Sequence, residues 1–280
     1  MSFKNSDISA GIVTYNPDIE KLKKNIDSII KQVDFLVIVD NKSKNIAELD
    51  RLISSYNKEK IFFKKNDANH GIAKALNIIA SIVKEKGYRW VLTLDQDSEC
   101  RENLIFNYLP YLSLEKIGQL SCLYEDRNFS NENHLFKGVK DVEWCITSAA
   151  LLNVDAWESV GGFDEELFID SVDFDICLKM REKGFHIYKV GFVGFLHEIG
   201  NGKTRKIFFY TVKTWNHSPF RRYYSTRNAL IVAKKHRLGT IKTLLGIIKH
   251  MFLIFVFEDE KKAKFERALA GVIDGLKYGE

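Results

Sequence analysis

The sequence predicts an α/β protein with a mostly parallel central sheet and helices packed on both of its faces. Short apolar runs typical of buried strands alternate with segments whose apolar residues recur every three or four positions, as on one face of a helix. This alternation continues through the first third of the chain, and it is typical of parallel sheets. At 280 residues, 45% of them hydrophobic, the chain can bury such a core as one large or two small domains.

The predicted elements follow one another without long linkers. The first strand, Ile8 to Thr14, is stopped by Pro17, and Asp18 is placed to cap the helix that follows. The next elements are a strand at 35–39, a helix from about Ile46, a strand at 61–63, a helix from about Gly71 and a strand at 90–94. In sheets of this kind, ligands bind outside the carboxyl ends of the strands.

Polar side chains stand at the carboxyl end of each of these four strands. They are Thr14 and Asn16, Asp40 and Asn41, Asn66 and Asn69, and Asp95 and Asp97. One polar strand end is ordinary loop chemistry, but four at the same edge of a sheet predict a shared binding site.

The run from Trp90 to Leu94 leads directly into two carboxylates one residue apart, Asp95 and Asp97. A carboxylate is costly to bury without a partner, and hard oxygen ligands suit Mg²⁺ or Mn²⁺, which also bind diphosphates. A cation site is therefore one interpretation. The alternative is a polar strand end at which Asp97 caps the next helix.

Several function classes are disfavoured. The first crossover lacks Gly-x-Gly-x-x-Gly and contains Pro17, which argues against a dinucleotide-dependent dehydrogenase, and the chain has no P-loop motif. No groove-reading motif accompanies the basic charge, so nucleic acid is not expected as a partner. The four cysteines form no CxxC pair and the first residues do not resemble a signal peptide, so we expect reduced core thiols.

Charge divides the chain unevenly. Residues 201–280 hold 17 Lys and Arg against 6 Asp and Glu, a net charge of +11, and the rest carries −6. The basic cluster with Arg221, Arg222 and Arg227 suits a diphosphate or a lipid diphosphate, or is a solvated helix. The apolar stretch 241–257 contains Lys242 and Lys249 and is short for a membrane span. It suits a helix on an anionic membrane, or a core or dimer helix.

Several motifs together point to a family. They are Val-Thr-Tyr-Asn-Pro at 13–17, Val-Asp-Asn-Lys-Ser at 39–43, Asn-His-Gly-Ile-Ala-Lys-Ala-Leu-Asn at 69–77, Leu-Asp-Gln-Asp-Ser at 94–98, Gly-Gly-Phe-Asp-Glu-Glu at 161–166, Val-Asp-Phe-Asp at 172–175, His197-Glu-Ile-Gly200 and Arg-Tyr-Tyr-Ser-Thr-Arg-Asn at 222–228. This set resembles the nucleotide-sugar domain of family 2 glycosyltransferases, and most of all bacterial rhamnosyltransferases of surface polysaccharide synthesis. The resemblance covers roughly residues 8–230.

The resemblance implies a GT-A fold over residues 1–205, followed by a basic amphipathic helical region at 206–280. It further implies a metal-dependent inverting transfer from a nucleoside-diphosphate sugar, with dTDP-rhamnose as the best candidate donor and a saccharide or lipid-linked saccharide as acceptor. The implied cofactor is Mn²⁺ or Mg²⁺. We expect a cytoplasmic protein, with peripheral contact to the inner face of the membrane or a homodimer formed through the C-terminal helices.

The resemblance also assigns roles to single residues. In this assignment Thr14, Tyr15 and Asn16 line the nucleoside pocket, Asp40 holds the base or ribose, and Asn69, Gly71, Ala73 and Asn77 lie along the nucleotide and sugar. Asp95 and Asp97 occupy the family's Asp-x-Asp position, His197 meets the metal or diphosphate, and Arg222 and Arg227 bind the diphosphate. Gly71 as a left-handed turn residue and Asn77 on a solvated helix face are the alternatives.

The catalytic base falls on Asp173 by alignment. Relatives carry a Glu-Asp pair at this point, and here Val172 replaces the Glu, so Asp170 or Asp175 is the supporting acid. A helix over 173–181 places Asp173 at its start, where the helix dipole stabilises the carboxylate. We expect its buried stripe to be Phe174, Cys177, Leu178 and Arg181.

Other expectations concern the sugar and rival functions. Thr147 and Ser148 are candidate sugar contacts, and Trp157 either stacks on an acceptor sugar or belongs to the core. A UDP-sugar donor is the first alternative. Alternatives of another class are a phosphatase or mutase with an Asp nucleophile, and a catalytically inactive assembly partner.

Overall fold

The computed structural model describes residues 7–127, 136–197, 203–207, 210–214 and 216–279. The start of the chain and Gly200 lie outside these ranges, so the expectation about a leader and part of the His197 motif are not described. The chain forms two compact units. The first runs to Asp126 and includes 136–166 and 173–197, and the second combines Leu167–Val172 with the chain from Lys203 onward.

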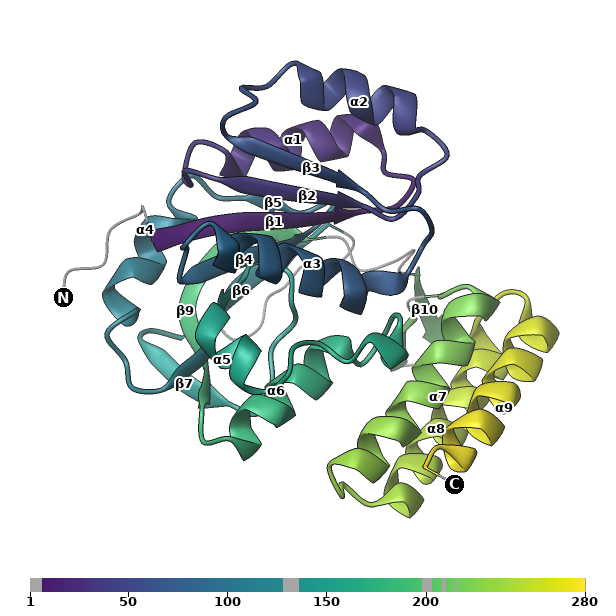
Figure 1. Cartoon of the computed structure of the whole chain (residues 1–280). Coiled ribbons are helices and arrows are strands. Elements are labelled where there is room, and N and C mark those ends of the chain that lie inside the picture. Colours follow the sequence, from purple (N-terminus) through teal and green to yellow (C-terminus); the bar gives the residue numbers. More distant parts are fainter. Residues whose placement is uncertain (1–6, 128–135, 198–202, 208–209, 215, 280) are drawn as a thin grey trace. The chain divides into compact units, whose positions relative to one another are not determined.

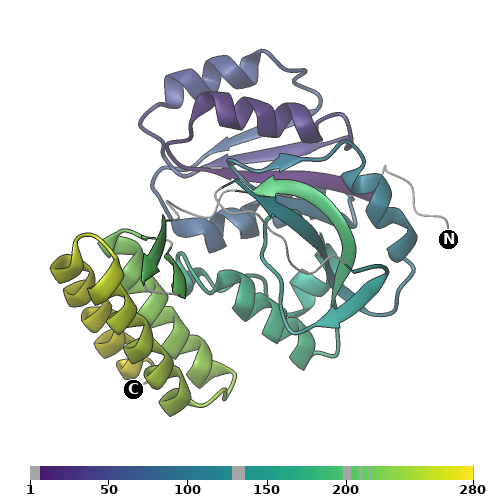
Figure 2. The same cartoon turned by 180° about the vertical axis from the view of Figure 1, so that it is seen from behind.

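The first unit is built around one sheet with helices on both faces (Figure 1). Its order is β3-β2-β1-β4-β8-β6-β9-β5, with β7 paired to β9. The strands are β1 Ile8–Thr14, β2 Leu36–Asp40, β3 Ile61–Lys65, β4 Trp90–Asp95, β5 Glu99–Cys100, β6 Ile117–Asp126, β7 Val139–Val142, β8 Ala150–Asn153 and β9 His186–His197. Helices α1 Ile19–Ile29 and α2 Ile46–Ser54 lie on one face of the β1–β4 half and α3 Gly71–Glu85 on the other, as Figure 2 also shows.

The four predicted strands and the three helices between them are confirmed. Strands β3, β2, β1 and β4 are parallel neighbours, and the side chain of Asp18 caps α1 by accepting from the backbone N–H groups of Glu20 and Lys21. Helix α3 packs closely on β1 because Gly11 has no side chain. A Cβ at Gly11 would lie 2.3 Å from Cγ2 of Ile79.

The second half of the sheet is mixed, which the periodicity did not predict. Strand β8 pairs antiparallel with both β4 and β6, and β9 is parallel to β6 but antiparallel to β5 and β7. Among the helices that follow β4, α6 Val172–Glu182 directly precedes β9, the strand that is parallel to β6. The other helices are short: α4 Leu104–Tyr108, η2 Leu109–Tyr111, α5 Val154–Ser159 and η3 Glu165–Leu167. Parallel neighbours need a long crossover connection, and antiparallel ones do not.

Helix α6 starts where the sequence predicted, but its buried stripe is different. Ile176, Cys177 and Met180 are fully buried, whereas Arg181 is exposed and pairs with Asp141. Cys177 and Leu178 of the predicted stripe are buried and Phe174 is half-buried, but the prediction was wrong for Arg181. Gln119 of β6 lies against the sulfur atoms of Cys177 and Met180. A single-face helical pattern does not anticipate such a contact.

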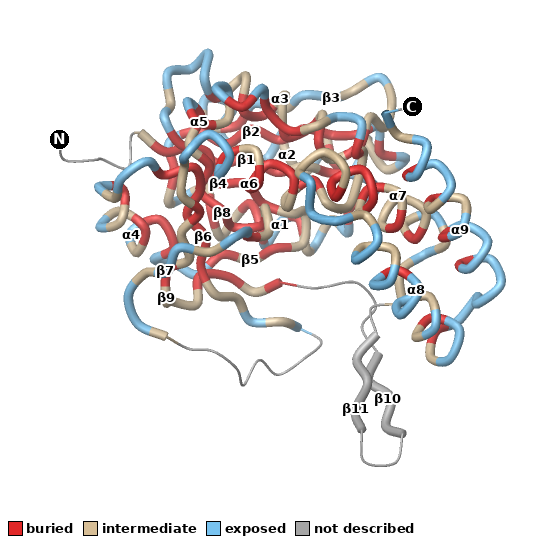
Figure 3. The backbone as a smooth tube through the Cα atoms, turned by 90° about the horizontal axis from the view of Figure 1, so that it is seen from below, coloured by how far each residue is buried: buried red, intermediate tan, exposed pale blue. Residues whose placement is uncertain are grey.

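The core lies along the strands of the first unit (Figure 3). All four cysteines are free and buried, as expected. Burial raises the pKa of Cys100 and of Cys122 to about 12, so both thiols stay protonated at neutral pH.

The second unit is a helical region with a hairpin. The hairpin is β10 Lys203–Ile207 with β11 Tyr210–Thr214, and the helices are α7 Pro219–Lys235, α8 Thr240–Phe257 and α9 Lys261–Lys277. The three helices lie side by side in Figure 1. Helix α8 is long and apolar enough to cross a membrane by length and composition, and 17% of it is buried.

Candidate active site

The carboxyl ends of β1, β2 and β4 meet at one edge of the sheet. Thr14 is level with Asp40 in the parallel register, and Val13 is level with Asp95. The predicted convergence of polar strand ends is therefore confirmed for these strands.

Asp40 braces this edge. Its carboxylate accepts hydrogen bonds from the Thr14 hydroxyl at 2.9 Å, from the Ser43 backbone N–H at 2.8 Å and from the Ser43 hydroxyl. Thr14 and Asp40 are both fully buried. Three protein donors keep the carboxylate satisfied in a buried position, so Asp40 holds the ends of β1 and β2 together whatever else it binds.

The residues after β1 are tied to the loops on either side. The Tyr15 backbone N–H donates to Oε1 of Gln96 at 2.8 Å, and Asn16 is linked to Ser43 and Lys44 at 2.7 Å each. Asn16 has a left-handed φ of 48°, a conformation that Asn tolerates better than most residues. Tyr15 is left 46% exposed.

A second chain of amides extends the edge toward α3. Asn66 donates to Asn41 at 2.9 Å, and Asn41 donates to the Gly71 carbonyl at 3.1 Å. The Asn69 side chain accepts from the Gly71 N–H at 3.0 Å, and Gly71 has a φ of +85°. The left-handed turn at Gly71 is thus present, and it directs α3 away from the strand end.

Two residues that the resemblance places along the nucleotide, Ala73 and Asn77, make contacts within the protein. Ala73 is fully buried in α3. Asn77 donates to the Phe163 carbonyl and to Glu165, and accepts from the Trp157 indole N–H at 3.0 Å and the Phe163 N–H at 2.8 Å. An Asn side chain has two donors and two acceptor positions, so Asn77 is saturated. In this structure Asn77 anchors the 162–165 loop and Trp157. Its contact with the nucleotide stays a prediction.

Asp95 and Asp97 stand on a tight loop that the rest of the edge supports. The next helix, α4, begins at Leu104, so the alternative in which Asp97 caps it is excluded. Asn25 donates to the Asp95 carbonyl at 2.6 Å, and the hydroxyls of Ser98 and Ser148 are 2.6 Å apart. Both carboxylate residues are half-buried.

His197 is brought to this loop by strand pairing. Strand β5 follows Asp97 and runs antiparallel to β9, with Glu99 opposite Leu196. The residues before Glu99 therefore run alongside His197, the last residue of β9. The imidazole is buried between the rings of Tyr124 and Phe195, and its Nδ1 has no hydrogen-bond partner in the described part of the chain.

These groups do not form a complete cage for a metal ion. Across the described residues, no three His, Cys, Asp or Glu side chains are grouped closely enough to hold one. The predicted three-ligand set of Asp95, Asp97 and His197 is therefore not assembled, since aromatic rings enclose the imidazole. The two carboxylates still fit Mg²⁺ or Mn²⁺, because such ions are commonly held by one or two carboxylates together with substrate phosphates.

Asp173 lies in the first turn of α6, as predicted. Its Oδ1 accepts the N–H of Phe174 at 2.9 Å, and the side chain is half-buried. Asp175 is fully buried, so of the two acids on this turn only Asp173 is open to solvent.

The arginines assigned to the diphosphate lie in the second unit. Arg222 is 3% exposed and pairs with Glu258 at 2.5 Å, while Lys264 pairs with the other Glu258 oxygen at 3.0 Å. The Arg222 guanidinium is thus buried in an ion pair between helices, and its binding of a diphosphate stays a prediction. Arg227 is half-exposed and donates to Asn228.

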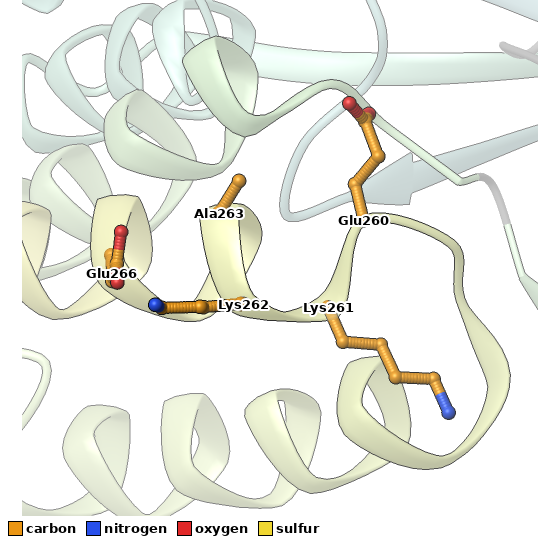
Figure 4. Close-up of a pocket in the computed structure, with 5 residues that line it drawn as sticks. All are labelled: Glu260, Lys261, Lys262, Ala263 and Glu266. Atoms are coloured by element: carbon orange, nitrogen blue, oxygen red, sulfur yellow. The ribbon is translucent and has the colours of Figure 1, made fainter.

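A hollow of about 580 Å³ lies at the start of α9 and is lined by five residues, none of which belongs to the predicted site: Glu260, Lys261, Lys262, Ala263 and Glu266 (Figure 4).

Sequence reasoning missed several residues of this edge. Gln96 links β4 to β1, Ser43 supports Asp40 and Asn16, and Ser98 supports Ser148. Each is a polar residue within a motif quoted above, at 39–43 or 94–98, and that position is the one signal that could have found them.

Comparisons with known proteins agree with this geometry. Residues 9–137 match the profile of Glycosyl transferase family 2. The chain is 30% identical over 292 residues to the dTDP-rhamnosyl transferase RfbF of Shigella flexneri, an alignment that covers 98% of this chain and 96% of that protein.

Solved structures confirm the fold. The S. aureus TarS 1–349 structure matches with a TM-score of 0.62 at 15% identity, covering 96% of this chain and 81% of that one. The mannosyltransferase PcManGT of Pyrobaculum calidifontis, in complex with GDP-Man and Mn²⁺, matches with a TM-score of 0.61 at 14% identity, covering 98% of this chain and 76% of that one. Polar groups gather at one edge of the sheet, and a relative with 30% identity matches 98% of the chain. The chain therefore belongs to glycosyl transferase family 2 and is a glycosyltransferase similar to bacterial rhamnosyltransferases.

Proposed function

We propose that this glycosyltransferase moves L-rhamnose from dTDP-rhamnose to a hydroxyl group of a saccharide or lipid-linked saccharide, with inversion at the sugar carbon, in the synthesis of a cell-surface polysaccharide. The observation that carries the proposal is the 30% identity to a dTDP-rhamnosyl transferase over 98% of the chain. A UDP-sugar donor is the alternative, since UDP is the nucleotide in one TarS complex.

The nucleotide-sugar donor binds at the edge formed by the carboxyl ends of β1, β2 and β4. Tyr15 and Asn16 flank the nucleoside, with Thr14 and Asp40 fixing the strand ends beneath them. Asp95 and Asp97 would hold Mg²⁺ or Mn²⁺, with His197 adjacent. The cation would neutralise charge that develops on the leaving diphosphate.

Asp173 acts as the general base toward the acceptor hydroxyl. An inverting transfer needs one base on the face of the sugar opposite the leaving group. The position in the first turn of α6 favours the ionised carboxylate, because the N-terminal end of a helix carries a partial positive charge. A carboxylate that stays ionised can accept the hydroxyl proton as the bond to the sugar forms.

The test is hydrolysis and transfer from a panel of dTDP- and UDP-sugars with Mn²⁺ or Mg²⁺. We expect release of dTDP from dTDP-rhamnose, loss of at least about 100-fold in Asp173→Asn, and loss of cation-dependent nucleotide binding in Asp97→Asn. Turnover of a phosphomonoester without any nucleotide-sugar turnover would favour the phosphatase alternative. Folded protein that binds a nucleotide sugar but never turns it over would favour the inactive partner.

Helix α8 supports a location at the membrane surface. Five apolar side chains along it are each more than 60% exposed: Ile241, Leu245, Ile248, Phe252 and Phe255. At 100° per residue they fall within about 80° of one another, and the exposed Lys242 and Lys249 border the stripe. An apolar stripe beside lysines suits an anionic bilayer, on which the helix would lie at the cytoplasmic face.

Sedimentation with vesicles tests this location. We expect binding to vesicles with phosphatidylglycerol, weaker binding to neutral vesicles, and loss of binding in Ile248→Ser/Phe252→Ser. A protein that stays off the vesicles and is a dimer, with the same double variant becoming monomeric, would assign the stripe to a homodimer instead.

A further inference from the structure

We infer that Trp144 and Phe174 form an aromatic platform that binds the acceptor sugar beside Asp173. The inference rests on the proposed function, because it names where the second substrate of that reaction lies. All the residues that carry it belong to the first unit.

The platform is an exposed aromatic pair next to the proposed base. Trp144 is 46% exposed, and its ring meets that of Phe174 edge to face, with centroids 6.0 Å apart and planes at 81°. Phe174 directly follows Asp173 in the first turn of α6 and is half-buried. A Trp with nearly half of its surface exposed leaves apolar area unburied, which a bound ring would cover.

The segment after Trp144 links this pair to the donor side. At its start, the Cys145 carbonyl accepts the Cys177 thiol of α6 at 3.8 Å. At its end, the Ser148 hydroxyl lies 2.6 Å from that of Ser98 and accepts the Asp95 N–H at 3.4 Å. Four residues span at most about 14 Å, so the backbone of Trp144 lies within that distance of Ser148, which contacts the carboxylate loop.

Trp157, the aromatic residue that the sequence suggested for this role, is engaged elsewhere. Its indole N–H donates to Asn77, and its ring lies against Gly162, where an added Cβ would approach it to 3.0 Å. The other exposed large aromatics of the described first unit are Tyr15, Phe62 and Phe106, none of which neighbours Asp173 in the chain or contacts Phe174 through a ring.

The chemistry of the pair selects a pyranose ring. One face of such a ring presents C–H groups that pack on an aromatic ring, while its hydroxyls need polar partners. The Asp173 carboxylate beside the platform supplies an acceptor for a hydroxyl, and it is the hydroxyl that must be deprotonated. A lipid tail would use the aromatics but leave the carboxylate facing hydrocarbon, at a cost.

The test measures glycoside binding directly. Methyl glycosides of rhamnose, galactose, glucose and N-acetylglucosamine are added with dTDP and Mg²⁺, and saturation transfer to the ring C–H protons is recorded by NMR. We expect transfer to at least one glycoside in the wild type, a loss of affinity of about 10-fold or more in Trp144→Ala, and partial recovery in Trp144→Phe. Phe106→Ala, which removes a more exposed ring on α4, is the matched control and should bind as the wild type does.

Two results would overturn the platform: equal saturation transfer in the wild type and Trp144→Ala, or none to any glycoside in the wild type. Failure of the proposed function is a different result, because it is read from nucleotide-sugar turnover without any acceptor. In the control Phe106→Ala that turnover by water should stay within about two-fold of the wild type, since no role in binding or catalysis falls on that residue. A thermal melt of each variant shows that the fold is retained.

Discussion

Residues at the edge of the sheet have two different roles: some support the loops, and others are presented by those loops to ligands. Asp40 and Asn77 both belong to motifs that the family resemblance assigns to the nucleotide, yet their polar atoms are engaged by the protein. A buried polar group without a partner is destabilising, so residues of this kind brace the loops that present Tyr15, Asp97 and Asp173.

Replacing Asn77 tests whether this residue stabilises the fold or binds the nucleotide. In Asn77→Ala the Trp157 indole and the Phe163 N–H both lose their acceptor, and we expect the free energy of unfolding to fall by about 2–3 kcal/mol in urea titration. Affinity for dTDP with Mg²⁺ should stay within about three-fold. The contrasting variant is Asp97→Asn, which should keep its stability and lose cation-dependent binding. An Asn77→Ala variant that keeps its stability and loses affinity for dTDP would instead support a nucleotide contact at Asn77.

At the scale of elements, helix α7 holds a strained segment. Phe168, Asp170 and Ser171 all have φ values between 58° and 65°, although none is glycine. The buried Asn228 amide nitrogen lies 2.5–3.0 Å from the carbonyl oxygens of Leu167, Ile169 and Asp170. Arg221 binds the Asp170 carboxylate at 2.9 Å. Left-handed residues persist where surrounding contacts enforce them, and they gather at functional sites.

Removing that support should relax the segment. We expect Asn228→Ala to lower the free energy of unfolding by about 2–3 kcal/mol, because three carbonyls lose their donor. The segment leads directly into α6, so kcat for sugar transfer should fall while the KM for the nucleotide sugar stays unchanged. Ser225→Ala, less than one turn away on α7, is the control and should change stability by less than about 0.5 kcal/mol. A normal kcat in Asn228→Ala would show that the strain has no bearing on catalysis.

At the scale of the whole molecule, the excess positive charge of the C-terminal region affects its own stability. Burial lowers the pKa of His217 to about 3, helped by the charges of Arg221, Arg222, His250 and Lys264. The unfolded chain restores a pKa near 6.5, so the unfolded state binds the proton more readily. Between pH 3 and 6.5 stability therefore rises with pH, and it is lost progressively on acidification below about 6.5.

Thermal unfolding between pH 5 and 7 tests this expectation. The wild-type midpoint should fall as the pH is lowered through this range, and His217→Gln should show a flatter slope, because the variant has no proton to gain at this position on unfolding. Carboxylates change little over this range, so the difference between the two proteins isolates the histidine. Parallel slopes would mean that His217 is as accessible to protons in the folded state as in the unfolded state.

The local sequence predicted the first half of the fold and the edge where the site lies. Strand and helix periods, the cap at Asp18 and the turn at Gly71 depend on a few consecutive residues, so they can be predicted from the local sequence. The pairing of β5 with β9, which sets His197 beside the Asp97 loop, joins residues about a hundred positions apart and leaves no local signal.

By itself, the sequence determined the family, the alternation of strands and helices, and the carboxylates at the end of β4. Only the tertiary structure decided which side chains are already engaged by contacts within the protein. Asn77 holds a loop, Arg222 pairs with Glu258, and the indole N–H of Trp157 donates to Asn77. The reason is physical. A residue type specifies what a side chain can bind, whereas its position among distant segments settles whether those binding groups are already satisfied.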